Sequence, residues 1–389
     1  MNICIISSAF PSKKNPIINI FIYRQAKALA ERGHKVFVVA GDTESRKESN
    51  MIVYARPKAI KSLFLALKIA LKSPRDFFWL LKNIGLKGTI GRLALVEIAS
   101  NLLKREEIDI IDGQWADYGG AVAYLVSKIW KKPYIVSALG SEVAEIADGV
   151  VGILPLKRVK ILRKVLENAD CIITVSKSLA DDVKKYCSRE PIILPWGIDL
   201  NLFKPHNEKV FKRRTIVCVG ALVKRKGHEF LLKAFKKVLN CINDVDLLII
   251  GWGPEEQELK KLVNNLGITD NVRFIDYVET SEFPKYYSSS EFFVSATLHE
   301  GFGVVFAEAM ACGLPIVSTN VGAVPEVVGE AGILVEPKNP EQLAEAMLKL
   351  LNDSKLREEL SKKALERASR FSIEKRTEDL EKIYEGYRR

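Results

Sequence analysis

The sequence has little that would suit a membrane-spanning protein. No stretch of the 389 residues reaches the roughly 18 uncharged apolar residues that a spanning helix needs, because the best candidate, residues 63–71, is interrupted by Lys68. The N-terminal segment MNICIISSAF leads directly into an expected strand, without a charged leader or a cleavage site. These absences predict a cytoplasmic protein.

Cysteine and histidine are both scarce and scattered. None of the six cysteines forms a C-x-x-C pair, and most lie inside apolar runs such as NICII and IVCVG. The four histidines lack the close spacing of metal ligands. We therefore expect buried, reduced thiols, and we expect neither a metal site nor a bound cofactor.

Two glycine motifs of nucleotide-binding proteins are also missing. Gly227 and His228 follow Lys226, so this basic loop is not the P-loop pattern G-x-x-x-x-G-K-[ST]. Neither half of the chain opens with a convincing G-x-G-x-x-G, since Gly251 and Gly253 supply only the first two glycines. The missing turn counts against a dehydrogenase.

Positive charge is what the chain has in excess, with a net +11. Residues 56–105 hold eleven basic and two acidic residues, a net +9. Apolar residues alternate with the lysines, as in KSLFLALKIALK, which predicts one or two basic amphipathic helices able to lie on an anionic membrane. The alternatives are solvated helices that pack on their own domain, and a nucleic-acid-binding face. No binding motif accompanies the charge, so no nucleic-acid partner is expected.

Short apolar runs alternate with helical segments almost throughout the chain. The helix expected over residues 21–32 ends at Gly33, and a second series of strands and helices begins with TIVCVG at 215–220. This order predicts an α/β fold of two facing Rossmann-like domains, each a doubly wound parallel sheet. Such sheets bind ligands at the carboxyl ends of their strands. The boundary is expected in the polar stretch 199–214.

The second domain opens with the segment VGALVKRKGHEF. Gly220 is expected to turn the backbone sharply, and a helix beginning at His228 could aim its amides at an anion. Lys224, Arg225 and Lys226 add positive charge at the same place, so the segment suits a diphosphate. The alternative is an ordinary strand-to-helix turn with a solvated basic loop.

A second candidate segment is LHEGFGVVFAEAMACG. Glu300 ends a loop, a helix is expected from Val304 to Cys312, and Glu308 follows Glu300 by eight residues, or about 12 Å of helix rise. That distance is similar to the span from a donor sugar to a ribose, and a carboxylate suits ribose hydroxyls. Backbone amides of residues 301–304 suit phosphates. Alternatively, Glu308 is a solvated helix residue and Glu300 a cap.

This segment resembles the E-x-x-x-x-x-x-x-E signature of the retaining glycosyltransferases of family 4 (glycosyl transferases group 1), which have the GT-B fold. The resemblance implies that Glu300 and Glu308 contact the donor sugar and the nucleotide ribose, and that Lys226 contacts the diphosphate. Weaker similarity covers most of the chain. It implies an acceptor-side domain over 1–200, a nucleotide-sugar domain over 201–370, and a helix over 371–389 that crosses back onto the first domain.

The chain also departs from the family pattern. Ala221 stands where family members often carry an arginine, for which Arg225 is the candidate substitute. Leu139 stands where many members carry a histidine before G-S-D, so a histidine contact to the donor sugar is in doubt. The usual glycine-rich loop after the first strand is replaced by NPIINIF, so contacts there are not carried over.

The resemblance implies transfer of a hexose from a UDP-, GDP- or ADP-sugar to an acceptor hydroxyl, without a metal and with retention of configuration. It also implies Lys226 and Glu300 as the catalytic residues, and a fixed cation such as Lys226 at the leaving diphosphate lowers the barrier. The basic segment motivates an acceptor that is a membrane lipid or a lipid-linked saccharide, met at the inner membrane face through residues 56–105. The expected donor-binding residues are Gly220, Arg225, Lys226, Glu300, Gly301, Phe302, Gly303, Val304 and Glu308.

Three other classes of function stay open from the sequence. One is another enzyme on the same fold, such as a nucleotide-sugar epimerase or a phosphorylase. A second is a non-catalytic relative that binds sugar nucleotides, motivated by Ala221 and Leu139. A third is a lipid- or nucleic-acid-binding module without catalysis, which would leave Glu300 and Glu308 unexplained.

Overall fold

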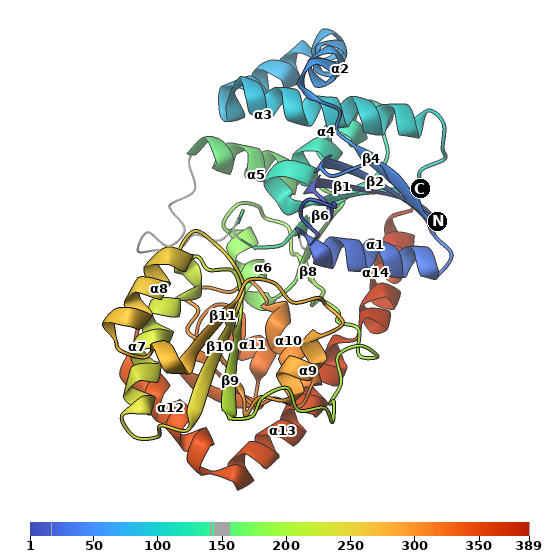
Figure 1. The fold of residues 1–389 in the computed structure, drawn as a ribbon. Coiled ribbons are helices and arrows are strands. Elements are labelled where there is room, and N and C mark those ends of the chain that lie inside the picture. Colours follow the sequence, from blue (N-terminus) through green and yellow to red (C-terminus); the bar gives the residue numbers. More distant parts are fainter. Residues whose placement is uncertain (17, 141, 144–155, 389) are drawn as a thin grey trace. The chain divides into compact units, whose positions relative to one another are not determined.

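The computed structural model describes residues 1–16, 18–140, 142–143 and 156–388, which form two compact units. The described part of the first unit comprises residues up to 143, residues 156–195 and residues 374–388. The second unit comprises residues 196–373 (Figure 1). The expected boundary at residue 200 therefore falls inside the second unit, a few residues past the observed change.

The first unit is built on an eight-stranded sheet with the order β3-β4-β2-β1-β5-β6-β7-β8. Every neighbouring pair is parallel except the antiparallel pair β3–β4 at one edge. The central strands are runs of buried Ile and Val, as a sheet covered on both faces requires. The strands are β1 (Asn2–Ala9), β2 (Lys35–Asp42), β3 (Arg46–Glu48), β4 (Met51–Ala55), β5 (Ile110–Gln114), β6 (Tyr134–Ala138), β7 (Cys171–Thr174) and β8 (Ile192–Ile193).

Helices cover both faces of this sheet, as in a doubly wound domain. In Figure 1, α3 and α4 lie on one face, and α1 and α14 lie on the other. A short π-helical turn, Trp115–Gly119, leads from β5 into α4. The helices are α1 (Ile20–Glu31), α2 (Ala59–Lys72), α3 (Pro74–Leu103), α4 (Gly120–Trp130), α5 (Leu156–Asn168), α6 (Lys177–Lys184) and α14 (Ile373–Tyr387).

The basic segment 56–105 forms two helices, which confirms the expected helical structure. They are α2 and α3, and α3 is interrupted at Gly85, where the backbone has a φ of 72°. In the described part of the chain no helix is both long enough and apolar enough to cross a bilayer.

A buried polar network connects the C-terminal helix α14 to the first sheet. Tyr384 donates a hydrogen bond of 2.6 Å to the Asp112 carboxylate on β5, and Arg376 donates to the carbonyl of Leu194 and to Gln25. Burial raises the pKa of Asp112, and the hydrogen bonds that its carboxylate accepts oppose that rise. The contacts place the C-terminal helix in the first unit from residue 374 onward.

The second unit has a six-stranded, fully parallel sheet with the order β11-β10-β9-β12-β13-β14. The chain adds strands on one side of β9 and then returns to add strands on the other side, so the order reverses between β9 and β12. The strands are β9 (Arg214–Val219), β10 (Val245–Ile250), β11 (Val272–Ile275), β12 (Phe293–Ser295), β13 (Ile316–Thr319) and β14 (Gly332–Val335).

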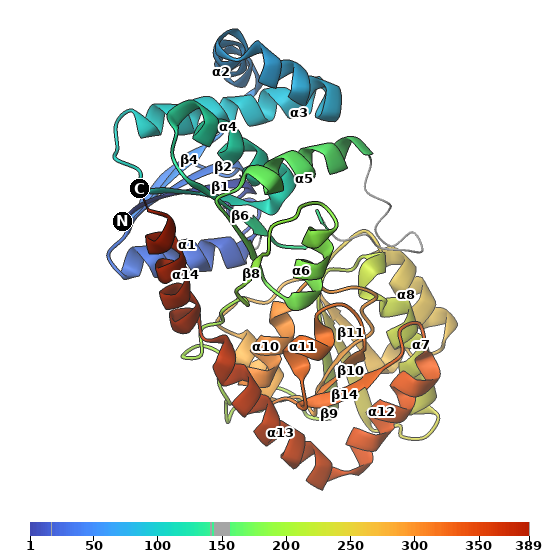
Figure 2. The ribbon, with the colours of Figure 1, turned by 180° about the vertical axis from the view of Figure 1, so that it is seen from behind.

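Helices also cover both faces of the second sheet. Figure 2 shows α7, α8 and α12 on one face, with α10 and α11 on the other. α7 begins at His228, where the sequence predicted the start of a helix. The helices are α7 (His228–Leu239), α8 (Glu256–Asn265), α9 (Phe283–Ser288), α10 (Val304–Ala311), α11 (Val324–Val328), α12 (Pro340–Asn352) and α13 (Ser354–Ala368).

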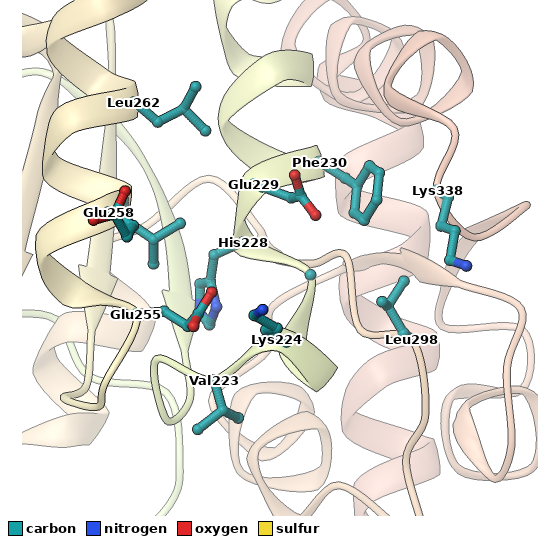
Figure 3. A pocket seen from close by; sticks show the side chains of 12 residues that line it. Val223, Lys224, His228, Glu229, Phe230, Glu255, Glu258, Leu262, Leu298 and Lys338 are labelled. Atoms are coloured by element: carbon teal, nitrogen blue, oxygen red, sulfur yellow. The ribbon is translucent and has the colours of Figure 1, made fainter. Parts of the chain in front are cut away.

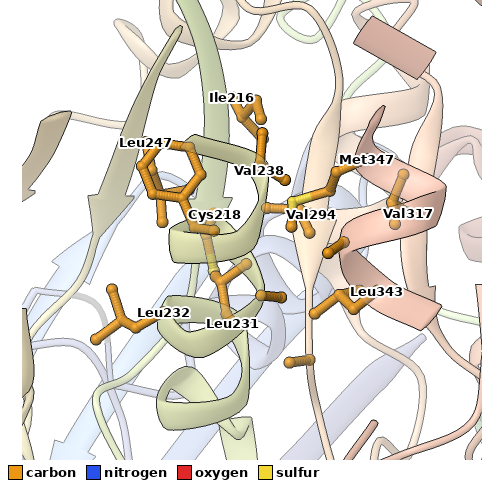
Figure 4. Close-up of a cluster of buried hydrophobic side chains, with 14 of the residues drawn as sticks. Ile216, Cys218, Leu231, Leu232, Val238, Leu247, Val294, Val317, Leu343 and Met347 are labelled. Carbon is orange, nitrogen blue, oxygen red and sulfur yellow. The ribbon is translucent and has the colours of Figure 1, made fainter. Parts of the chain in front are cut away.

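The core of the second unit is packed between β9, β10, α7 and α12. Figure 4 shows Ile216 and Cys218 of β9 beside Leu231 of α7 and Met347 of α12, all of them buried. Burial of apolar surface of this kind contributes about 25 cal/mol per Å² to stability. This core fixes where β9 ends and α7 begins, and therefore positions the loop between them.

The cysteines are free, and five of the six are buried as expected. Cys241 is the exception. It lies just past the end of α7 and is exposed. Burial raises the pKa of the thiols of Cys4 and Cys218 to about 12, so both are protonated at neutral pH.

Candidate functional site

The candidate site of the second unit lies where the strand order reverses. The loop 220–227 follows β9 and the loop 296–303 follows β12, and these two strands are neighbours in the sheet. Both loops leave the carboxyl ends of parallel strands, so they meet at the same edge. Sheets of this type bind ligands at such a reversal point.

Hydrogen bonds join the two loops directly. The Leu298 amide donates to the carbonyl of Arg225 at 2.8 Å, and the Thr297 hydroxyl donates to the same carbonyl at 3.3 Å. Gly227 has a φ of 63°, and a Cβ at this position would lie 2.1 Å from the carbonyl oxygen of Ala296. Only glycine fits there, so Gly227 is what allows the two loops to approach each other.

Lys226 and Glu300 form the centre of the site. The Lys226 Nζ contacts Oε2 of Glu300, and their side chains are only 13% and 10% exposed. The Arg225 guanidinium lies 3.7 Å from the same carboxylate oxygen and donates to the carbonyl of His299 at 2.8 Å. Burial opposes ionisation of Glu300, but the two cations outweigh it and hold the pKa of Glu300 below its usual value. The site therefore contains a buried carboxylate and two cations at neutral pH.

The start of α10 lies next to this cluster. The Ala323 amide donates to the carbonyl of Glu300 at 2.9 Å, which fixes the loop from the β13 side. Gly303 has a φ of 78°, and a Cβ there would lie 2.5 Å from the ring of Phe306 and 2.9 Å from Cγ of Glu300. Because Gly303 provides no side-chain cap, the first turn of α10 presents backbone amides at the positive end of the helix dipole.

Glu308 lies on α10 and is 7% exposed, so it is not the solvated helix residue of the alternative interpretation. The expected separation of about 12 Å from Glu300 counts all eight intervening steps as helical. That assumption is wrong, since α10 begins at Val304 and only the last four steps are helical. The two carboxylates are therefore not a fixed helical distance apart.

The backbone bends at Gly220, directly after β9, as expected. Gly220 is not among the positive-φ glycines, and a Cβ there would lie 3.6 Å from Cε of Lys226, an ordinary contact. The left-handed conformation that requires glycine in this loop lies at Gly227.

Comparison with known proteins shows the family of the chain. The model of glycosyl transferases group 1 matches residues 201–367, and the model of glycosyltransferase family 4 matches residues 18–202. Together they cover both units.

The chain belongs to glycosyltransferase family 4. It is a nucleotide-sugar-dependent, retaining hexosyltransferase with the GT-B fold.

Two relatives and one solved structure of the same fold illustrate what the chain is similar to. The GDP-mannose-dependent α-(1-6)-phosphatidylinositol monomannoside mannosyltransferase of Mycobacterium tuberculosis is 30% identical over 222 residues, which span 51% of this chain and 57% of that protein. The D-inositol 3-phosphate glycosyltransferase of Corynebacterium jeikeium is 28% identical over 68% of this chain and 70% of that protein. The sucrose-phosphate synthase of Thermosynechococcus elongatus shares the fold with a TM-score of 0.81 at 21% identity, over 99% of both chains.

Sequence reasoning missed a buried histidine at the site of this glycosyltransferase. His228 is the first residue of α7 and is 3% exposed, and neither ring nitrogen has a hydrogen-bond partner among the described residues. Burial, together with the nearby Lys226, lowers the pKa of His228 to about 4. A single histidine without metal-ligand spacing gave no signal beyond the start of a helix.

His228 also borders a cavity of about 600 Å³ beside the two loops. Figure 3 shows Glu229 of α7 and Glu258 of α8 around it, together with Glu255 just before α8, and with Lys224 and Lys338 from adjoining segments. Lys224 faces this cavity, whereas Lys226 contacts Glu300. The basic cluster predicted as one group is therefore divided between two places.

The departure at Leu139 has a structural counterpart in the first unit of the glycosyltransferase. Leu139 is buried, and its amide and that of Gly140 donate to the carboxylate of Glu142 at 2.6 and 2.9 Å. Burial, with a further contribution from Asp117, raises the pKa of Glu142 to about 7. Ser141 of this segment lies outside the described residues. The departure from the family pattern drew attention to Leu139, but it gave no indication that Glu142 is buried.

No metal-binding cluster of three or more His, Cys, Asp or Glu side chains occurs among the residues that the structure describes.

Proposed function

We propose that the diphosphate of the donor binds between the loop 220–227 and the first turn of α10. The supporting observation is the contact of Lys226 with Glu300 at the reversal point of the sheet. Lys226 would bind the diphosphate together with the amides at residues 301–304, and Arg225 would add charge in place of the family arginine that Ala221 replaces. Glu300 would contact the donor sugar and Glu308 the ribose.

The charges of this site suit departure of a nucleoside diphosphate. When the bond from the anomeric carbon to the diphosphate breaks, the leaving oxygen gains negative charge, which fixed cations and amide dipoles stabilise. Without donor, Lys226 is neutralised by Glu300. A bound diphosphate would compete for Lys226, while Arg225, at 3.7 Å, would stay close enough to keep Glu300 ionised. The acceptor hydroxyl would then attack on the face from which the diphosphate leaves, giving retention.

We further propose that the acceptor is a membrane lipid or a lipid-linked saccharide. On α2 and α3, each helix buries one set of apolar residues, such as Ile69 and Leu80, yet leaves others exposed. That disfavours the alternative in which the whole apolar stripe packs on its own domain. The exposed apolar side chains are Ile60, Leu63, Phe64, Leu67, Leu71, Phe78 and Leu86.

The relatives support a phosphorylated acceptor. The mycobacterial relative is named for a phosphatidylinositol monomannoside acceptor and the corynebacterial one for D-inositol 3-phosphate. Lysines interleave with the exposed apolar residues of α2 and α3, so the same surface would attract anionic lipid headgroups. This surface, residues 56–105, is the proposed site of peripheral membrane contact.

Turnover with isolated membranes tests the proposal. The protein is incubated with candidate nucleotide sugars, with and without extracted membrane lipid, and the released nucleoside diphosphate and glycosylated products are identified by mass spectrometry. Lipid-dependent release with a new glycolipid supports the proposal. Conversion of the donor without acceptor, giving an altered nucleotide sugar, would instead indicate an epimerase.

A further inference from the structure

A second cavity lies in the first unit, enclosed by α2, α3 and the end of β2. Its volume is about 680 Å³, within the range of small-molecule binding sites. Gly41, Asp42 and Thr43 border it at the carboxyl end of β2, the edge of a doubly wound sheet where ligands bind. We call it the α2–α3 cavity.

The walls of the α2–α3 cavity are apolar and incompletely covered. Ile60 and Leu63 line it from α2, and Leu86 and Ile90 line it from α3. Ile60 is 74% exposed, Leu63 is 43% exposed and Leu86 is 59% exposed. Contiguous exposed apolar side chains around a cavity mark a site that another molecule covers.

The mouth of the α2–α3 cavity is positively charged. Arg56, Lys58 and Lys87 line it, against a single acid, Asp42. Arg56 lies 3.4 Å from the Asp42 carboxylate, and that carboxylate is itself 78% exposed. Among the described residues, no ion pair joins Lys58 or Lys87 to an acid, so positive charge is left over beside the apolar walls.

We propose that the α2–α3 cavity binds one hydrocarbon chain of a phosphorylated lipid, with the lipid phosphate at Arg56, Lys58 and Lys87. The complementarity of an apolar chamber and a cationic mouth to an apolar chain and an anionic headgroup carries the inference. This inference rests on the proposed lipid acceptor and specifies where the protein holds that acceptor. The remaining exposed apolar residues of α2 and α3, outside the cavity, contact the bilayer surface.

The direct test is binding of alkyl phosphates to the full-length protein without vesicles. Octyl, decyl and dodecyl phosphate are titrated below their micelle concentrations by calorimetry, with inorganic phosphate and neutral dodecyl maltoside as comparisons. Each two-carbon extension should tighten binding about tenfold, because every buried methylene adds a similar increment. Inorganic phosphate and the neutral detergent should bind much more weakly. Affinity that does not change with chain length, or no binding of dodecyl phosphate, overturns the inference.

Matched variants separate the cavity from the surrounding surface. Leu63→Asp and Leu86→Asp alter partly exposed wall positions and should weaken dodecyl phosphate binding at least tenfold. The double change Lys58→Gln with Lys87→Gln should weaken it several-fold and leave the dependence on chain length. Leu71→Asp and Phe78→Asp are the controls, since they change exposed residues of the same helices that do not line the cavity. The controls should bind dodecyl phosphate normally, and equal losses in wall and control variants contradict the assignment.

Parallel nucleotide titrations keep this inference separate from the proposed function. Alkyl phosphate binding without any nucleotide binding would leave the cavity assignment standing and remove the proposed donor site. Nucleotide binding without chain-length-dependent alkyl phosphate binding would leave the proposed donor site standing and remove the cavity assignment.

Discussion

At the scale of single residues, the contact between Lys226 and Glu300 carries most of the account. Glu300 is held ionised by its neighbours, and Lys226 is the cation within direct reach of it. Neither residue stands on a flexible surface loop, because the two loops are joined through Arg225 and Gly227. The pair is therefore positioned before any donor binds, as electrostatic stabilisation of a leaving group requires.

Replacement of Lys226 by alanine should lower kcat/KM about 100- to 1,000-fold, the cost of losing one preorganised group at a developing charge. The assay measures release of nucleoside diphosphate with the donor that binding identifies. Lys224→Ala is the matched control, since Lys224 borders the other cavity. Equal losses in the two variants would mean that net loop charge, rather than the Lys226 position, matters.

Glu308→Ala should weaken nucleoside diphosphate binding about tenfold, as expected for losing a hydrogen bond to a charged group. Comparing the ribonucleotide with its 2′-deoxy and 3′-deoxy analogues by calorimetry makes the test specific. The wild type should bind the deoxy analogues more weakly than the ribonucleotide. Glu308→Ala should bind the deoxy analogues and the ribonucleotide equally well. A deoxy penalty that persists in Glu308→Ala would refute the ribose contact.

His228 should make the second unit sensitive to acid. Its pKa falls from 6.5 to about 4 on folding, so between these values the unfolded state binds a proton that the folded state does not. The neutral His228 therefore lowers the free energy of unfolding least above pH 6.5. As the pH falls from 6.5 towards 4, the free energy of unfolding decreases by up to about 3 kcal/mol. Urea unfolding of the wild type and His228→Phe across this range measures the difference. Parallel curves for the two proteins would contradict the buried, unpartnered imidazole.

Much of this residue-level description could be predicted, and some of it could not. The sequence predicted the loops of Lys226 and Glu300, since glycine-flanked charged residues after strands are a local pattern. It did not identify Gly227 as a position where only glycine fits, because that constraint comes from a non-local neighbour, the carbonyl of Ala296. The buried Glu142 depends on tertiary burial and left no local signal.

At the scale of elements, the order of strands and helices was predicted more completely than their bounds. The sequence predicted the start of α7 at His228, and the family resemblance implied a C-terminal helix over 371–389, where α14 spans Ile373–Tyr387. The hairpin of β3 and β4 was not predicted. β3 has only three residues, RKE, and lies at the sheet edge, where no buried face imposes an alternating pattern.

The surface of α2 and α3 should bind anionic vesicles in a salt-dependent way. Lys68→Glu and Lys72→Glu, on exposed positions of α2, should each weaken binding about fivefold or more, since a lysine near such a surface contributes about 1 kcal/mol. Flotation with phosphatidylglycerol vesicles measures it, and Lys362→Glu on α13 is the control. Unchanged flotation in the α2 variants, or no flotation of the wild type at low salt, would remove the membrane role.

At the scale of the whole molecule, the site depends on strand order more than on any single segment. Residues 226 and 300 are 74 positions apart in the chain, and they meet because β9 and β12 are neighbours on either side of the reversal. Local sequence patterns do not encode which strands are adjacent. Family resemblance supplied this part of the prediction, and the strand order gives its physical reason.

The central claim is that a nucleotide sugar binds at Lys226 and Glu300, and thermal unfolding tests it most directly. Wild type and Lys226→Ala are screened against UDP, GDP, ADP and their common sugar conjugates. A ligand at about 100 times its Kd stabilises the folded state by about 2.7 kcal/mol, which raises the Tm by roughly 5 to 10 °C. The account predicts such a rise with one nucleotide in the wild type and its loss in the variant. No rise with any nucleotide, or an equal rise in both proteins, would contradict it.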